Sequence, residues 1–209
     1  MNKKDIQNFI QILKNTYPDA TCSLDFKTPF LMVVAVMLSA QCTDERVNKT
    51  TPALFERCKT IQDFANIDLK ELEQIVHPCG FYKNKSKNIK LCAKQILENF
   101  GGEVPQTMEE LLILAGIGRK SANVILLEAF GIANGIAVDT HVKRISNRLG
   151  LSAEKEPEKI EQDLLKILPK EDLKDINHLL VWHGRKTCDS RKPRCEECTV
   201  KDYCKYYKS

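Results

Sequence analysis

Between residues 114 and 139 the chain reads LAGIGRKSANVILLEAFGIANGIAVD, which places a lysine where it could act as a nucleophile. Gly116 and Gly118 lie in a short connection between two helical patterns, and Lys120 follows on the first turn of the second helix. A glycine hairpin before a helix exposes backbone N–H groups that can bind an anion such as a phosphate. The positive end of the helix dipole disfavours the charged form of the amine, and a neutral amine is a nucleophile. This segment therefore predicts a phosphate-binding hairpin with a candidate amine nucleophile beside it.

The nine cysteines of the chain fall into two groups. Five are scattered and are expected to be small buried packing residues, namely Cys22, Cys42, Cys58, Cys79 and Cys92. The other four lie within seventeen residues and can surround one metal centre, with the spacing Cys188-x6-Cys195-x2-Cys198-x5-Cys204. Structural zinc sites usually have two C-x2-C pairs, and this segment has one. The spacing therefore favours an iron–sulfur cluster, with zinc and no metal as the alternatives.

Composition and charge indicate a soluble globular protein with a basic end. The chain has 209 residues, of which 43% are apolar and 29% charged, and a net charge of +4. Its longest apolar run, residues 30–38, is shorter than the roughly 20 residues that cross a bilayer, and residues 1–19 contain no secretory signal. Residues 184–209 carry the whole excess of positive charge, which indicates either a polyanion partner or a solvated tail. A cytosolic protein is expected.

Hydrophobic periodicity indicates helices almost throughout, with no convincing run of strands. Residues 30–39 are apolar on nearly every side, so they should form a central buried helix. The expected fold class is all-α, with helices at residues 5–14, 30–39, 44–55, 61–65, 68–76, 83–100, 108–114, 119–130, 139–149, 157–168 and 173–184.

Several motifs occur together and in a fixed order: LSAQCTD at 38–44, LAGIGRK at 114–120, VDTH at 138–141, and HGRxxC followed by the cysteine-rich tail. Over essentially the whole chain this combination resembles the endonuclease III family of helix-hairpin-helix DNA glycosylases. The resemblance implies two helical domains flanking a DNA-binding cleft. Residues 22–135 would form a six-helix barrel domain ending in the hairpin. Residues 1–21 and 136–209 would form a second domain, with a [4Fe–4S] cluster bound by Cys188, Cys195, Cys198 and Cys204.

The resemblance also implies catalytic roles for Lys120 and Asp139, which would face each other across the cleft. Lys120 would attack C1′ of a damaged nucleotide, expel the base and form a Schiff base. β-Elimination would then cut the strand on the 3′ side. The helix N-terminus, Arg119 and partial burial are expected to favour the neutral amine. Asp139 would support positive charge on the sugar and assist deprotonation of the nucleophile. From the residues alone, Lys120 could simply contact a phosphate and Asp139 could cap a helix, a role compatible with catalysis.

A base inside a duplex must be flipped out before it can react. Gln41 matches the glutamine that fills the resulting gap, although a polar residue at a helix end is the alternative. Phe81, in the turn CGFY, stands where family members commonly have leucine, and its ring could stack between bases. Backbone N–H groups of Gly116 and Gly118 would bind a DNA phosphate without reading the sequence.

Other basic and titratable residues are expected near the DNA backbone. Arg119 lies in the hairpin, while Arg185 and Lys192 lie beside the cysteines. His141 could be a proton shuttle, or it could have a structural role or contact a phosphate, so no catalytic role is assigned to it. His183 is expected to be a core histidine with satisfied hydrogen bonds rather than a metal ligand.

These inferences predict a monomeric, cytoplasmic, nucleoid-associated enzyme whose partner is double-stranded DNA containing oxidised pyrimidines or abasic sites. It would be a bifunctional DNA glycosylase and apurinic/apyrimidinic lyase. One alternative keeps the fold but removes adenine or mismatched thymine. The adenine-removing branch typically has a further C-terminal domain and lacks the lysine, whereas this chain ends five residues after Cys204. A second alternative is a non-catalytic iron–sulfur protein that binds DNA or transfers electrons, which the presence of both Lys120 and Asp139 disfavours.

Overall fold

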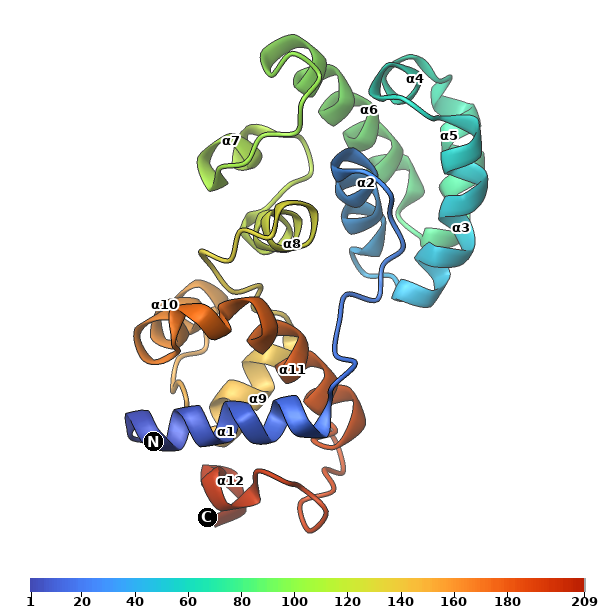
Figure 1. The fold of residues 1–209 in the computed structure, drawn as a ribbon. Coiled ribbons are helices and arrows are strands. Elements are labelled where there is room, and N and C mark those ends of the chain that lie inside the picture. The colour runs from blue at the N-terminus through green and yellow to red at the C-terminus, as the bar shows by residue number, and fades with distance from the viewer. Residues whose placement is uncertain (209) are drawn as a thin grey trace. The chain divides into compact units, whose positions relative to one another are not determined.

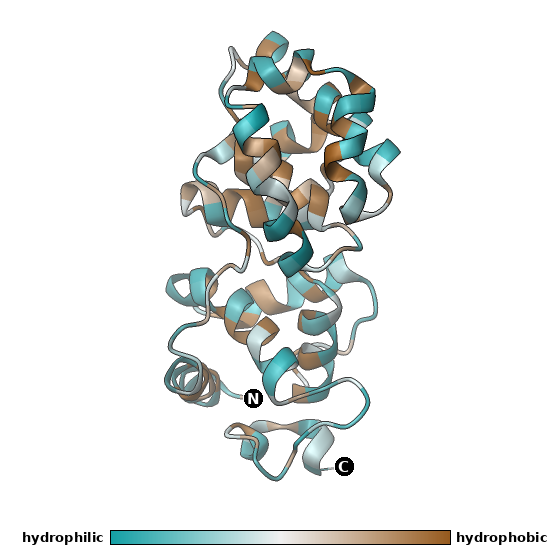
Figure 2. Cartoon of the chain, turned by 90° about the vertical axis from the view of Figure 1, so that its right-hand side faces the viewer, coloured by the Kyte–Doolittle hydropathy of each residue, from teal (hydrophilic) through white to brown (hydrophobic). Residues whose placement is uncertain are grey.

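The computed structural model describes residues 1–208, and every regular element in that range is a helix (Figure 1). The all-α class expected from the sequence is therefore confirmed. The chain divides into two compact units, which we call the hairpin unit (Ser23–Gly131) and the cysteine unit (Met1–Cys22 with the chain from Ile132 onward). Most helices of both units carry both hydrophobic and hydrophilic residues, as amphipathic helices do (Figure 2).

The hairpin unit is built around one buried helix. Its helices are α2 (Pro29–Ser39), α3 (Asp44–Arg57), α4 (Ile61–Asn66), α5 (Leu69–Val76), the short 3-10 helix η1 (His77–Cys79), α6 (Tyr82–Asn99), α7 (Met108–Ile113) and α8 (Arg119–Phe130). Helix α2 begins at a Thr28 cap, with Pro29 in its first turn, and every residue from Phe30 to Leu38 is buried. It packs against α3, α6 and α8, so the prediction of a central helix is confirmed.

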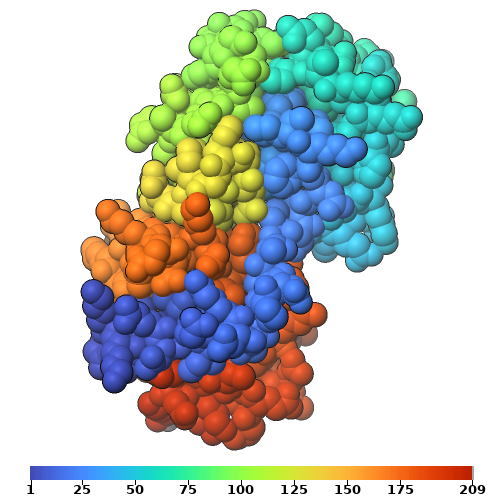
Figure 3. Space-filling model, viewed as in Figure 1, coloured from blue at the N-terminus to red at the C-terminus, as the bar shows by residue number. Residues whose placement is uncertain are grey.

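The cysteine unit packs its first helix against its last long one. Its helices are α1 (Lys3–Thr16), α9 (Thr140–Leu149), α10 (Pro157–Ile167), η2 (Lys170–Asp172), α11 (Leu173–Lys186), η3 (Lys201–Tyr203) and α12 (Lys205–Lys208). The apolar stripe of α1 is buried in a core formed with α9, α10 and α11. Thr16 and Thr199 join α1 to the cysteine-rich segment through a 3.0 Å hydrogen bond. Figure 3 accordingly shows the blue N-terminal helix beside the red C-terminal segment.

The structure also extends the pattern predicted from sequence. Helix α3 continues to Arg57 although Pro52 lies inside it, because its buried face, which includes Val47 and Leu54, holds the helix together on both sides of the proline. Short helices η3 and α12 in the tail were not expected. Within residues 1–208, none of the helices has the length and apolar character needed to cross a membrane.

Candidate active site and cysteine-lined pocket

The glycine hairpin between α7 and α8 is fixed by the side chains around it. Leu114 and Ile117 are buried on either side of Gly116, which has a left-handed backbone with φ of 78°. A Cβ atom at Gly116 would lie 2.8 Å from the Met37 side chain and 3.0 Å from that of Asn88. Only glycine suits both the backbone angle and this close approach.

The N-terminal end of α8 is open to a ligand. Gly118 is the capping residue of α8, and no side chain caps this helix end. The first N–H groups of a helix lack intrahelical partners, and together with the helix dipole they form a site for an anion. Lys120 lies on this first turn and is exposed. The partial burial expected for Lys120 is therefore wrong, because its side chain is exposed.

Asp139 begins helix α9 in the cysteine unit. Its carboxylate Oδ1 accepts a 2.8 Å hydrogen bond from the backbone N–H of Val142, so the helix-capping interpretation is confirmed. Asp139 follows the buried residues Ile136–Val138 and is itself half-buried. The cap fixes the direction of the carboxylate on a rigid helix end.

His141 lies in the first turn of α9, where that helix packs against α11. Its Nδ1 is 3.2 Å from the Arg144 guanidinium, and burial lowers the pKa of the imidazole, with the Asp139 carboxylate opposing this shift. A Cβ atom at Gly184 of α11 would lie 2.8 Å from the same Nδ1. His141 is therefore half-buried against α11, and Gly184 is needed for the close helix crossing.

Gln41 and Phe81 share an unusual backbone. Among the described residues they are the two non-glycine positions with positive φ, at 54° and 47° respectively. Gln41 follows the end of α2, and Phe81 precedes the start of α6. Both are exposed, and Phe81 retains 63% of its surface. A left-handed backbone at such residues is costly and is concentrated at functional sites.

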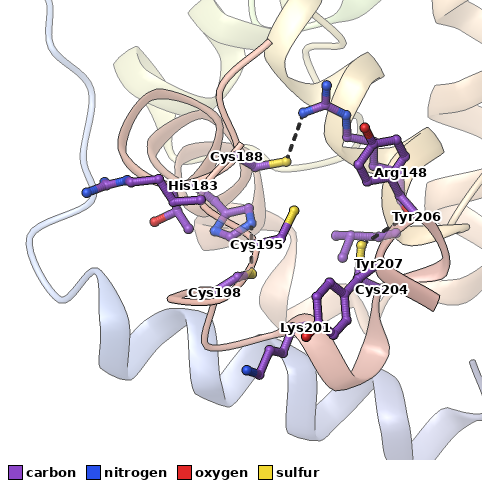
Figure 4. Close-up of a pocket in the computed structure, with 12 residues that line it drawn as sticks. Arg148, His183, Cys188, Cys195, Cys198, Lys201, Cys204, Tyr206 and Tyr207 are labelled. Carbon is purple, nitrogen blue, oxygen red and sulfur yellow. Dashed lines mark hydrogen bonds between the residues drawn. The ribbon is translucent and has the colours of Figure 1, made fainter. Parts of the chain in front are cut away.

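The four tail cysteines line one pocket in the cysteine unit. The side chains of Cys188, Cys195, Cys198 and Cys204 lie around this pocket (Figure 4). No group of three His, Cys, Asp or Glu side chains among residues 1–208 is close enough to hold a single metal ion. Iron–sulfur clusters are bound by four cysteine thiolates, so the four thiols around this pocket fit such a cluster.

Two arginines of α9 hold the start of the cysteine-rich loop. Arg148 donates to the Sγ of Cys188 at 3.2 Å and to the carbonyl of Asp189 at 2.6 Å. Arg144 donates to the carbonyls of Gly184 and Cys188 at 3.0 and 3.2 Å. Sequence reasoning missed both residues, although their spacing of four on one helix face is a signal for a shared partner. N–H bonds to a ligating sulfur also tune an iron–sulfur cluster.

His183 is a core histidine, as expected. It is 1% exposed, its Nδ1 is 3.0 Å from the Tyr17 hydroxyl, and its Nε2 is 3.8 Å from the Sγ of Cys198. Burial lowers its pKa to about 4, so the ring is neutral at physiological pH. By contrast, Arg185 and Lys192 are exposed on α11 and on the loop that follows.

Comparisons with known proteins identify the family. Residues 34–170 match the HhH-GPD superfamily of base excision DNA repair proteins, and residues 188–204 match the iron–sulfur binding domain of endonuclease III. Endonuclease III of Synechocystis is 51% identical over 97% of this chain and 92% of the relative. Endonuclease III of Escherichia coli K12 is 40% identical over 99% of this chain and 97% of the relative. A solved trapped endonuclease III–DNA covalent intermediate is 40% identical with a TM-score of 0.93, covering 100% of this chain and 98% of that one.

The chain is thus a base excision DNA repair protein of the helix-hairpin-helix class, and within that class it belongs to the endonuclease III family. It is a DNA glycosylase and apurinic/apyrimidinic lyase. The iron–sulfur match also confirms the predicted cofactor, a [4Fe–4S] cluster.

Proposed function

We propose that this enzyme removes oxidised pyrimidine bases from duplex DNA and then cuts the strand on the 3′ side of the abasic site. The observation that carries the proposal is the position of Lys120, exposed on the uncapped first turn of α8 directly after the glycine hairpin. A lysine there can reach a sugar while the neighbouring N–H groups hold its phosphate. The solved covalent endonuclease III–DNA intermediate supports a covalent mechanism in this family.

The reaction proceeds through a lysine Schiff base. The neutral Nζ of Lys120 attacks C1′, the glycosidic bond breaks, and the base leaves with the bonding electrons and takes up a proton. Opening of the sugar ring gives an imine between Nζ and C1′. Loss of a proton from C2′ then expels the 3′ phosphate, and water releases the enzyme. The step removes the base and cuts the strand without moving net electrons.

Asp139 stabilises charge in this reaction. Its carboxylate is directed by the hydrogen bond to Val142, so little reorganisation is needed when positive charge develops on the sugar. The same carboxylate accepts a proton from the attacking amine, which keeps Lys120 nucleophilic.

Other residues hold the DNA and fill the space of the flipped nucleotide. Gln41 satisfies the base left unpaired, and Phe81 stacks into the helix. Their exposed side chains and left-handed backbone support this role. The phosphate contacts are assigned to Gly116, Gly118, Arg119, His141, Arg185 and Lys192.

The cluster serves as a cross-link within the DNA-binding surface. Its proposed ligands are Cys188, Cys195, Cys198 and Cys204, and when bound it fixes a loop that carries exposed basic side chains. We assign the hairpin domain to residues 22–135 and the cluster domain to residues 1–21 and 136–209. The enzyme is proposed to act as a monomer in the cytoplasm, at the nucleoid.

Substrate choice is tested by base release from matched duplexes. Duplexes containing thymine glycol, 8-oxoguanine opposite cytosine, a thymine mismatch or no damage are incubated with protein that retains its cluster. Release from the thymine glycol duplex alone supports the assignment. Preferred release of the mismatched thymine or of a purine overturns it.

A further inference from the structure

A buried lysine joins the two turns that carry Gln41 and Phe81. Lys85, in the first turn of α6, is only 7% exposed. Its Nζ donates to the carbonyl of Leu38 at 2.8 Å and to that of Cys79 at 2.9 Å. Leu38 lies three residues before Gln41, and Cys79 lies two residues before Phe81. One ammonium group therefore donates hydrogen bonds to the chain just ahead of both Gln41 and Phe81, the two exposed residues with left-handed backbone.

We propose that Lys85 is a positioning residue for nucleotide flipping, which fixes the backbone from which both Gln41 and Phe81 enter the DNA. The inference rests on the proposed gap-filling roles of these two residues. Gln41 and Phe81 then act as one preformed unit, because Lys85 holds both turns.

Both hydrogen bonds of Lys85 satisfy carbonyl groups at the ends of helices. Leu38 is next to the last residue of α2, where carbonyl groups have no partner within the helix. Cys79 ends η1, directly before the turn at Gly80. Burial lowers the pKa of Lys85, and the two carbonyl oxygens offset the cost of placing an ammonium there. Hydrogen bonds with a charged donor are stronger than neutral ones, so these bonds restrain both turns.

A second link lies beside the first. Burial raises the pKa of the Cys79 thiol, and the neighbouring side chains of Thr50 and Cys42 also influence it. Cys42 directly follows Gln41. The turn after α2 and the turn before α6 therefore lie close together beside Lys85.

This arrangement explains why the unusual backbone persists. A non-glycine residue with positive φ relaxes unless its surroundings fix it. Here the same Nζ holds the carbonyl three residues before Gln41 and the carbonyl two residues before Phe81. Two side chains held in advance bind DNA with a smaller loss of conformational freedom than two independent flexible turns. Lys85 acts in this way without touching the DNA.

The test compares Lys85→Met with a matched variant on the same helix, Lys90→Met. Lys90 donates to the carbonyls of Ala65, near the end of α4, and of Ile67, which follows α4. It therefore binds a part of the chain other than the turns of Gln41 and Phe81. Single-turnover base release is measured on a thymine glycol duplex. Strand cleavage is measured on a single-stranded oligonucleotide with an abasic site, which has no opposite base to fill.

Lys85→Met is expected to slow release from the duplex about tenfold, the scale of a lost charged hydrogen bond, and to leave single-strand cleavage within about twofold. Lys90→Met should change both rates by the same factor. In a Gln41→Ala, Phe81→Ala background, Lys85→Met should have no further effect on duplex release. The partial donor Lys85→Gln should give an intermediate duplex rate, and it replaces Lys85→Met if that variant does not fold.

Equal slowing on both substrates, or a full additional loss in the double-alanine background, overturns the positioning role. An active wild type with an unchanged Lys85→Met duplex rate overturns it as well. A cluster-loaded wild type that cleaves the abasic strand but never releases thymine glycol instead overturns the proposed substrate.

Discussion

The hairpin at residues 114–118 and the loop at residues 188–204 are both proposed to contact the DNA backbone, yet they are held in different ways. The hairpin rests on a core: Leu114 and Ile117 are buried, and Gln95 of α6 accepts from the N–H of Ala115 at 2.7 Å. Within residues 188–204, only Val200 and Cys204 are buried. The loop depends instead on four cysteines and on arginines of α9. The hairpin is therefore held by the packing of its own unit, whereas the loop at residues 188–204 depends on the bound cluster.

Lys120→Ala should separate chemistry from binding most strongly. Strand cleavage at an abasic site is expected to fall by at least about 10³-fold, as when a catalytic nucleophile is removed. Absorption of the cluster near 400 nm and DNA affinity within about threefold should remain, because Lys120 lies outside the cysteine loop. Gel assays of cleavage and fluorescence anisotropy give the two quantities. Retained cleavage would contradict the role of Lys120.

Cys198→Ala should damage the cysteine loop and spare the hairpin unit. Loss of one ligand is expected to remove the absorption of the cluster and to weaken DNA binding about 10- to 100-fold at physiological salt, because basic phosphate contacts lose their support. Hydrogen exchange should rise in residues 188–204 and stay unchanged in residues 108–130. The scattered Cys92→Ala serves as the control, since Cys92 lies in α6 of the hairpin unit. An equal rise of hydrogen exchange in residues 188–204 and 108–130 would contradict the view that only the loop depends on the cluster.

Gly116→Ala tests whether the close packing of the hairpin stabilises the hairpin unit. The positive φ and the contacts with Met37 and Asn88 predict a loss of about 2–4 kcal/mol in unfolding free energy. Gly118→Ala should cost about 1 kcal/mol or less, since nothing lies within 4 Å of a Cβ there and its φ is −104°. Denaturant unfolding followed by circular dichroism measures both variants. Equal losses would show that the close approach at Gly116 is unimportant.

Lys14→Met should have the smallest effect, because it alters the helical part of the cysteine unit rather than its loop. Lys14 pairs with Asp172 and Asp175 at 2.7 Å, and these contacts raise the pKa of its amine. Partial exposure and screening limit the expected loss to about 0.5–1 kcal/mol. A raised lysine pKa stabilises the fold below about pH 10.4, and this contribution disappears as the pH rises through the folded-state value.

Thermal unfolding of the wild type and Lys14→Met at pH 8 and pH 11.5 measures this difference. The difference in unfolding temperature between the two proteins should be smaller at pH 11.5 than at pH 8. An unfolding-temperature difference that stays constant would show that lost packing of the lysine stem, rather than lost charge, destabilises Lys14→Met.

The sequence predicted features that depend on local patterns. Helix α2, the glycine hairpin and the cap at Asp139 follow from periodicity and from preferences that act within a few residues. The hydrogen bonds of Arg148 to Cys188 and of Lys85 to Leu38 could not be predicted, because the partners lie 40 and 47 residues away in the chain. The left-handed backbone of Gln41 and Phe81 is likewise set by tertiary contacts. The exposure of Lys120 depends on what covers the first turn of α8, which a local pattern does not report.

The central claim is that the amine of Lys120 forms the covalent bond to DNA. The most direct test is borohydride trapping of cluster-loaded wild type on a thymine glycol duplex, followed by proteolysis and mass spectrometry of the DNA-linked peptide. The account predicts one linked peptide, with the modification on Lys120. A link to another lysine or to the N-terminal amine, or no covalent complex at all, would contradict it.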